Sequence, residues 1–216
     1  MNTSATARTA TVLALLGAAG ISAIALNDAA TFALTGQYSA ASDEFGLNPL
    51  FVLSGIVHGL AYLAFTAVLH LHRHRVDAGS RFRRVARVVL SLALVALAAG
   101  MLGSTAVAMV QGEIVDSGAL GALAGINFLL MFVGGVMLGF ALLRRRELRP
   151  AAMTLVAIVP AILLVILLAA VGSPWAHPAY AEVMVGFGLA FIGLTPRPRP
   201  ALADGEVVAG TVRAPA

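Results

Sequence analysis

The chain has 216 residues, of which 60% are hydrophobic and only 11% are charged. A soluble domain carries about a quarter charged residues, so this chain could not cover its surface with polar groups in water. Its apolar residues form continuous blocks of about 17–25, the length that a helix needs to cross roughly 30 Å of hydrocarbon. Because polar and apolar residues do not alternate within the blocks, the pattern favours helices over a membrane barrel. The composition therefore predicts an all-α polytopic membrane protein.

Two counts restrict the chemistry. The chain has no cysteine, which excludes a disulfide, a thiolate metal site, an iron–sulfur cluster and a cysteine nucleophile. All fourteen basic residues are arginines, and they lie beside the apolar blocks. The net charge of +4 therefore indicates membrane topology rather than nucleic-acid binding. The abundance of Ala, Gly, Val and Arg is typical of a GC-rich bacterial genome, so we expect a bacterial plasma-membrane protein.

The apolar blocks predict a bundle of six transmembrane helices, at about 10–34, 49–70, 88–110, 119–143, 151–172 and 180–195. Residues 1–9 should form a cytoplasmic N-terminus, and residues 196–216 a disordered cytoplasmic tail. Pro160 should kink the fifth helix. Arg8 and Ala23–Ala25 are also compatible with a signal peptide, whose cleavage would leave five spans. The first block is long for a signal peptide, which favours an uncleaved span.

The charges differ between the two sides of the membrane. With the N-terminus inside, every arginine faces the cytoplasm. Six of the ten acidic residues then face outside: Asp28, Asp43, Glu44, Glu113, Asp116 and Glu182. This asymmetry is the one that the positive-inside rule describes. It predicts that both termini are cytoplasmic.

Polar side chains at mid-membrane depth form the first candidate site. His58 lies nine residues into the second span and Asn127 eight residues into the fourth, about 12–13 Å below the outer face. Tyr62 follows His58 by one helical turn. An ionisable group in hydrocarbon is costly and suggests a function. His58, Tyr62 and Asn127 could bind a polar group or relay a proton; alternatively they are interhelical hydrogen bonds, worth about 0.6 kcal/mol on average.

Acidic residues form a second candidate site, an outer rim made of Asp28, Glu113, Asp116 and Glu182. This rim could collect cations. Alternatively, these groups are simply solvated, and Glu182 stabilises the first turn of the sixth helix through the helix dipole.

Arginines at the inner ends of the spans form the third candidate site. The candidate contacts for anionic lipid head groups are Arg81, Arg83, Arg84, Arg87, Arg144, Arg145 and Arg146. Each such charge can contribute about 1 kcal/mol near an anionic surface. Topology alone would also explain them.

The histidines are possible ligands of a metal or a haem. His70, His72 and His74 alternate beside arginines, which disfavours a metal site. His58 has no histidine partner at matching depth for a haem. We therefore expect no metal or cofactor.

Three G-x-x-x-G pairs, which begin at Gly55, Gly121 and Gly135, predict close helix packing or a dimer contact.

The region from Gly36 to Gly55, with the letters G-Q-Y-S and L-N-P-L-F-V-L-S-G, resembles small six-span bacterial membrane proteins of uncharacterised domain families. This resemblance covers at most a quarter of the chain and transfers no function. The chain lacks nucleotide-loop, H-E-x-x-H and G-x-S-x-G motifs.

Three functions fit the sequence. The leading hypothesis is a non-enzymatic accessory or binding component that packs with lipid, another membrane protein or a second copy. The second is a small-molecule or proton-coupled transporter with a midplane site. The third is a membrane-embedded enzyme acting on a lipid or quinone.

Overall fold

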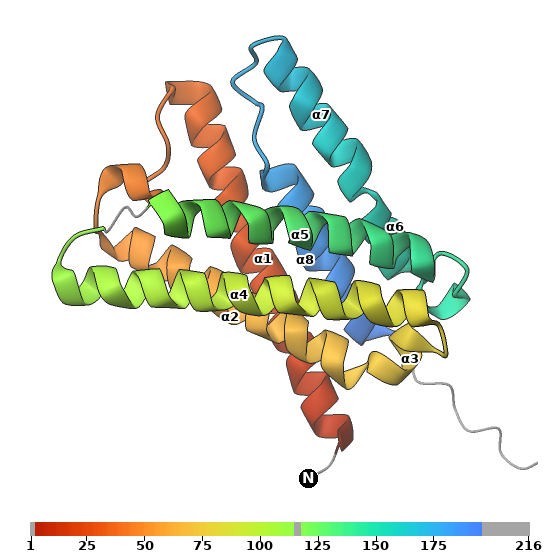
Figure 1. The fold of residues 1–216 in the computed structure, drawn as a ribbon. Helices are drawn as coiled ribbons and strands as arrows, with labels where there is room; N and C mark the ends of the chain where they lie inside the picture. The colour runs from red at the N-terminus through yellow and green to blue at the C-terminus, as the bar shows by residue number, and fades with distance from the viewer. Residues whose placement is uncertain (1–2, 115–117, 196–216) are drawn as a thin grey trace, which may run out of the picture.

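The computed structural model describes residues 3–114 and 118–195, and in them the chain is all α-helical (Figure 1). The four longest helices are α1 (Thr3–Thr35), α2 (Pro49–Leu71), α4 (Arg81–Gln111) and α5 (Gly118–Leu142). The shorter ones are α3 (Arg73–Asp77), α6 (Arg149–Val156), α7 (Ile158–Ala170) and α8 (Ala179–Leu194). Single 3₁₀ turns lie at Asp43–Phe45 and Arg146–Leu148.

Five segments are long and apolar enough to cross a membrane, so the chain is a polytopic membrane protein. They are Ala5–Thr35, Pro49–Leu71, Arg81–Gln111, Gly121–Leu142 and Arg146–Ala170. Each overlaps one of the first five predicted spans, and three of them begin five to seven residues earlier than predicted. The sixth predicted span corresponds to α8, which has 16 residues. That is shorter than the roughly 20 residues that a helix needs to cross a bilayer.

Local signals set the helix boundaries. The Asn48 side chain accepts hydrogen bonds from the backbone N–H groups of Leu50 and Phe51, and Pro49 occupies the first helical position of α2. The fifth predicted span is interrupted at Ala157, between α6 and α7. Pro160 has no N–H to donate to the carbonyl three to four residues earlier, which accounts for the break.

α8 begins in the interior of the bundle rather than at its outer end. From the far end of α7 the chain runs back toward the bundle before α8 starts (Figure 1). This return segment, residues 171–178, brings His177 to Asp28, about two turns before the end of α1. At the other end of α8, Arg75 donates a hydrogen bond to the Thr195 carbonyl at 3.0 Å. α8 therefore covers only the inner part of the bundle, and it packs on α1, α2, α6 and α7.

The three glycine pairs lie in two different environments. Two pairs pack against neighbouring helices, so an added methyl group would meet other atoms at 3.0 Å or less: Gly55 and Gly59 in α2, and Gly135 and Gly139 in α5. The third pair, Gly121 and Gly125 in the first half of α5, has no such neighbour within 4 Å. The first two pairs thus serve packing within the chain, whereas the third faces open space.

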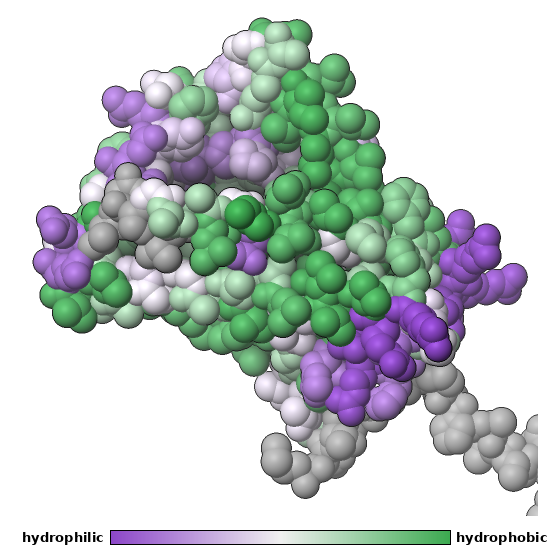
Figure 2. All heavy atoms as spheres, in the orientation of Figure 1, coloured by the Kyte–Doolittle hydropathy of each residue, from purple (hydrophilic) through white to green (hydrophobic). Residues whose placement is uncertain are grey.

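Hydrophilic side chains gather at opposite ends of the molecule, with a mainly hydrophobic surface between them (Figure 2). One group lies over α3 and the start of α4, where the arginines are. Figure 2 also shows a hollow with hydrophilic side chains between α5 and the outer part of α7.

Candidate functional site

Glu182 of α8 is held inside the bundle by two side chains of α2. The Tyr62 hydroxyl donates a hydrogen bond to Glu182 Oε1 at 2.6 Å. His58 Nε2 lies 3.8 Å from the same oxygen. The exposed fractions are 1% for Tyr62, 8% for His58 and 9% for Glu182. A carboxyl, an imidazole and a phenol therefore share one buried position, which we call the carboxyl cluster.

The geometry of two helices creates this cluster. Ser54, His58 and Tyr62 are spaced four residues apart, so they line one face of α2. The His58 and Tyr62 rings meet edge-on, with 6.1 Å between centroids. α8 runs alongside this face, and its first turn carries Glu182, where the helix dipole favours a negative charge. The return segment before α8 is what carries this turn to the level of His58.

The hydrogen bonds of His58 define where a proton can be held. Its Nδ1 lies 2.8 Å from the Ser54 carbonyl oxygen, which can only accept, so Nδ1 carries a hydrogen. In a neutral ring Nε2 is then an acceptor, and it faces Glu182 Oε1, which is also an acceptor. One added proton, on either group, would turn this opposition into an attraction.

Asn127 makes a different contact from the one expected. Its side-chain amide donates to the Leu123 carbonyl, on its own helix α5, at 2.8 Å. The partners of His58 come instead from α2 and α8. Of the predicted midplane residues, the structure thus joins His58 and Tyr62, and it supplies Glu182 as their partner.

The contact of Glu182 with His58 and Tyr62 was not predicted from the sequence. Counting depth from the start of the sixth apolar block placed Glu182 at the outer rim. In the structure the return segment carries the first turn of α8 to His58 and Tyr62, so Glu182 lies beside the predicted midplane residues. The sequence signal that could have indicated this role is that Glu182 is an acidic residue within the short apolar block 180–195.

The other acidic residues of the predicted rim lie apart from the cluster. Asp28 accepts a hydrogen bond from the Ser39 backbone at 2.7 Å, and its Oδ2 lies 3.5 Å from His177 Nε2. Glu113 is exposed, and Asp116 is outside the described residues. No group of three or more His, Asp or Glu side chains suited to a metal ion occurs among the described residues.

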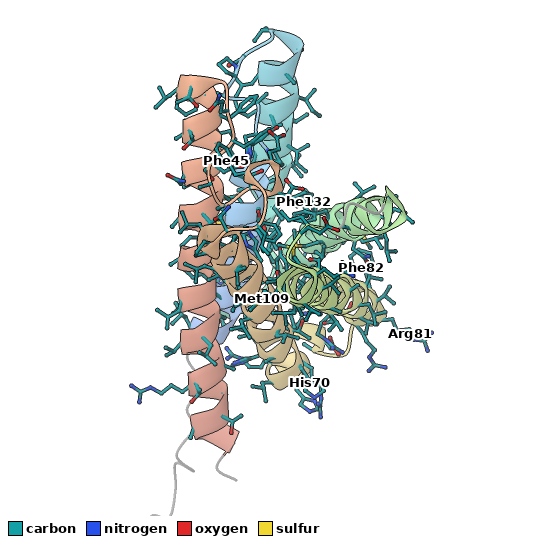
Figure 3. All side chains as sticks on the ribbon, turned by 90° about the vertical axis from the view of Figure 1, so that its left-hand side faces the viewer. Phe45, His70, Arg81, Phe82, Met109 and Phe132 are labelled. Carbon is teal, nitrogen blue, oxygen red and sulfur yellow. The ribbon has the colours of Figure 1, made fainter. Side chains whose placement is uncertain are left out.

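The candidate lipid-contacting arginines differ in their pairing. Arg87 forms a two-point ion pair with Asp77, at 2.8 and 3.0 Å. Arg145 pairs with Glu147 at 2.6 Å. Arg81 extends away from the helices (Figure 3). His70 lies at the inner end of α2 in the same view, where its Nε2 is 2.8 Å from Arg73 Nη1.

No protein-family model, no curated protein and no solved structure matches this chain. What is shown of its class is the polytopic helical membrane architecture described above.

Proposed function

We propose that the protein is a small proton-coupled transporter of the bacterial plasma membrane, with the carboxyl cluster as its proton site. The supporting observation is that two titratable side chains, Tyr62 and His58, converge on one carboxyl oxygen of a third, the buried Glu182. Ionisable groups inside a membrane are costly and commonly belong to proton relays. A packing role would need only one hydrogen bond between helices, worth about 0.6 kcal/mol on average.

The position of α8 supports the same proposal. Many transporters build their central site at a helix that starts within the membrane, next to a non-helical segment. α8 and the return segment 171–178 have this form. We propose that together they make the sixth crossing, so that both termini are cytoplasmic.

Proton binding can be measured without knowing the transported molecule. Proteoliposomes adsorbed on a solid-supported membrane should give a transient current after a pH step. Glu182→Gln should reduce the displaced charge at least about tenfold, because Gln keeps the size and hydrogen-bonding capacity but cannot take up the proton. Glu147→Gln, at an exposed acid beside Arg145, is the matched control and should leave the current intact. Equal currents from the two variants, or no current from the wild-type protein, would refute the proton site.

Topology can be tested in intact cells, because the chain has no cysteine of its own. Single cysteines at Ser42, Ser117 and Ser173 should react with an impermeant maleimide, whereas those at Ser80 and Ala203 should not. Reaction at Ser80 would reverse the proposed orientation. Reaction at Ala203 with protection at Ser80 would mean that α8 does not complete a crossing.

A second candidate function has its own supporting observation. The Gly121–Gly125 face of α5 has no neighbour within 4 Å, and small residues of this kind allow another helix to approach closely. This face favours an accessory or binding component that packs with another membrane protein or with a second copy.

A further inference from the structure

We propose that the outer end of α1 and α2 holds a binding site for a small, uncharged, amphipathic molecule. A cavity of about 550 Å³ lies between the last turns of α1, the segment 37–45 and the start of α2. Pockets for small molecules typically measure about 300–1,000 Å³ and combine apolar walls with a few polar groups. This proposal does not depend on proton coupling.

Part of the cavity lining carries polar groups without a hydrogen-bond partner among the described residues. Asn27 and Thr31 lie one turn apart on α1, and Gln37 and Tyr38 follow in the connecting segment. None of these four side-chain polar groups forms a hydrogen bond with another described residue. Thr35 differs from them, because its hydroxyl already donates to the Thr31 carbonyl at 2.7 Å. Four uncharged donors or acceptors are therefore available to one ligand.

The rest of the lining is mainly apolar. Phe45, Leu50 and Leu53 belong to it and are each about half exposed, at 52%, 53% and 53%. Figure 3 shows Phe45 beside the outer part of α1. A ligand with an apolar portion would cover these side chains and gain roughly 25 cal/mol for each Å² of apolar surface removed from water.

The charge of the lining defines the ligand class. No Asp, Glu, Arg or His belongs to the residues that line this cavity. A charged head group would gain no counter-charge from these residues, so the lining favours an uncharged one. Hydroxyl or carbonyl groups, in contrast, can pair with the amides of Asn27 and Gln37.

The wall of the cavity is held in place before any ligand binds. Asn48 donates to the carbonyls of Ala40 and Gly46, at 2.9 and 3.0 Å. Asp28 accepts from the Ser39 backbone, and Tyr38 stacks on Phe32 with ring centroids 4.7 Å apart. A preformed wall lowers the entropy that binding would otherwise cost.

The probe for this site is an alkyl glucoside that carries a diazirine in its chain. The full-length protein in lipid nanodiscs is irradiated with the probe, and labelled peptides are identified by mass spectrometry. We expect labelling to concentrate on residues 23–53, and octyl glucoside to compete at about tenfold lower concentration than octyl sulfate or octyltrimethylammonium.

Two variants test the polar side against matched controls. Asn27→Leu with Thr31→Val removes two hydrogen-bonding groups at nearly constant size and should weaken competition about tenfold. Asn127→Leu with Thr154→Val makes the same changes away from the cavity and should have no effect. Ala23→Trp leaves the polar groups in place but fills the cavity, and it should also abolish the concentrated labelling.

The outcomes that overturn the proposal are distinct. Labelling spread along the lipid-facing helices, or unchanged in both Asn27→Leu/Thr31→Val and Ala23→Trp, would show that the cavity binds nothing of this kind. Equal competition by either charged octyl compound would refute the uncharged class. Loss of the pH-step current would not bear on any of these results.

Discussion

Gly139→Ala should destabilise the protein by about 1–3 kcal/mol, because the added methyl group overpacks a rigid contact. A Cβ at Gly139 would lie 2.8 Å from Leu155 Cβ and 3.0 Å from the backbone nitrogen of Val156. Leu155 is fully buried, and it also packs closely against Gly188 of α8. α6 therefore cannot move away from the new methyl group without disturbing this second contact.

Gly121→Ala is the matched control, since it makes the same change in the same helix. An added Cβ there has no neighbour within 4 Å, and Ala favours a helix over Gly by up to about 1 kcal/mol. Thermal unfolding of the two variants in detergent should therefore give a lowered midpoint for Gly139→Ala and an equal or raised one for Gly121→Ala. An equal decrease in both would contradict the packing described for α5 and α6.

The contrast between these glycines shows what the sequence could and could not predict. Gly121 and Gly139 both belong to a G-x-x-x-G motif. The motif predicts only that another helix can approach closely there. Which helix approaches depends on packing order, which is a property of distant segments. The length of each apolar block is a local signal, and it located five of the helical segments, although the helix that contains the third block begins at Arg81 rather than near residue 88.

The same contrast between local signals and contacts of distant segments applies to the candidate site. His58 and Tyr62 share a face because of their spacing along one helix, and the sequence predicted that pair. Glu182 lies 120 residues from Tyr62, and no local pattern links the two. Depth was counted on the assumption that every span starts at the membrane surface. α8 starts after a return segment, so counting along the sequence did not bring Glu182 to the level of His58.

Tyr62→Phe should cost about 1–3 kcal/mol of stability, because it removes a hydroxyl that pairs with a buried carboxyl and leaves that carboxyl under-satisfied. Tyr180→Phe is the control on α8: no hydrogen bond joins its hydroxyl to another described residue, and the change should stay within about 0.5 kcal/mol. Unfolding free energies that do not differ between the two variants would show that the Tyr62–Glu182 bond contributes nothing.

A double-mutant cycle with Glu182→Leu separates the bond from the cost of leaving one partner alone. Each single change strands a buried polar group, whereas the double variant removes both, so its loss should be smaller than the sum of the single losses. A coupling of at least about 0.5 kcal/mol is expected for two groups in direct contact. The same cycle distinguishes packing from function. If the double variant is more stable than the single variants but gives no current after a pH step, the carboxyl cluster binds the proton in addition to joining α2 and α8. If the current persists without Glu182, the cluster is only a structural contact between α2 and α8.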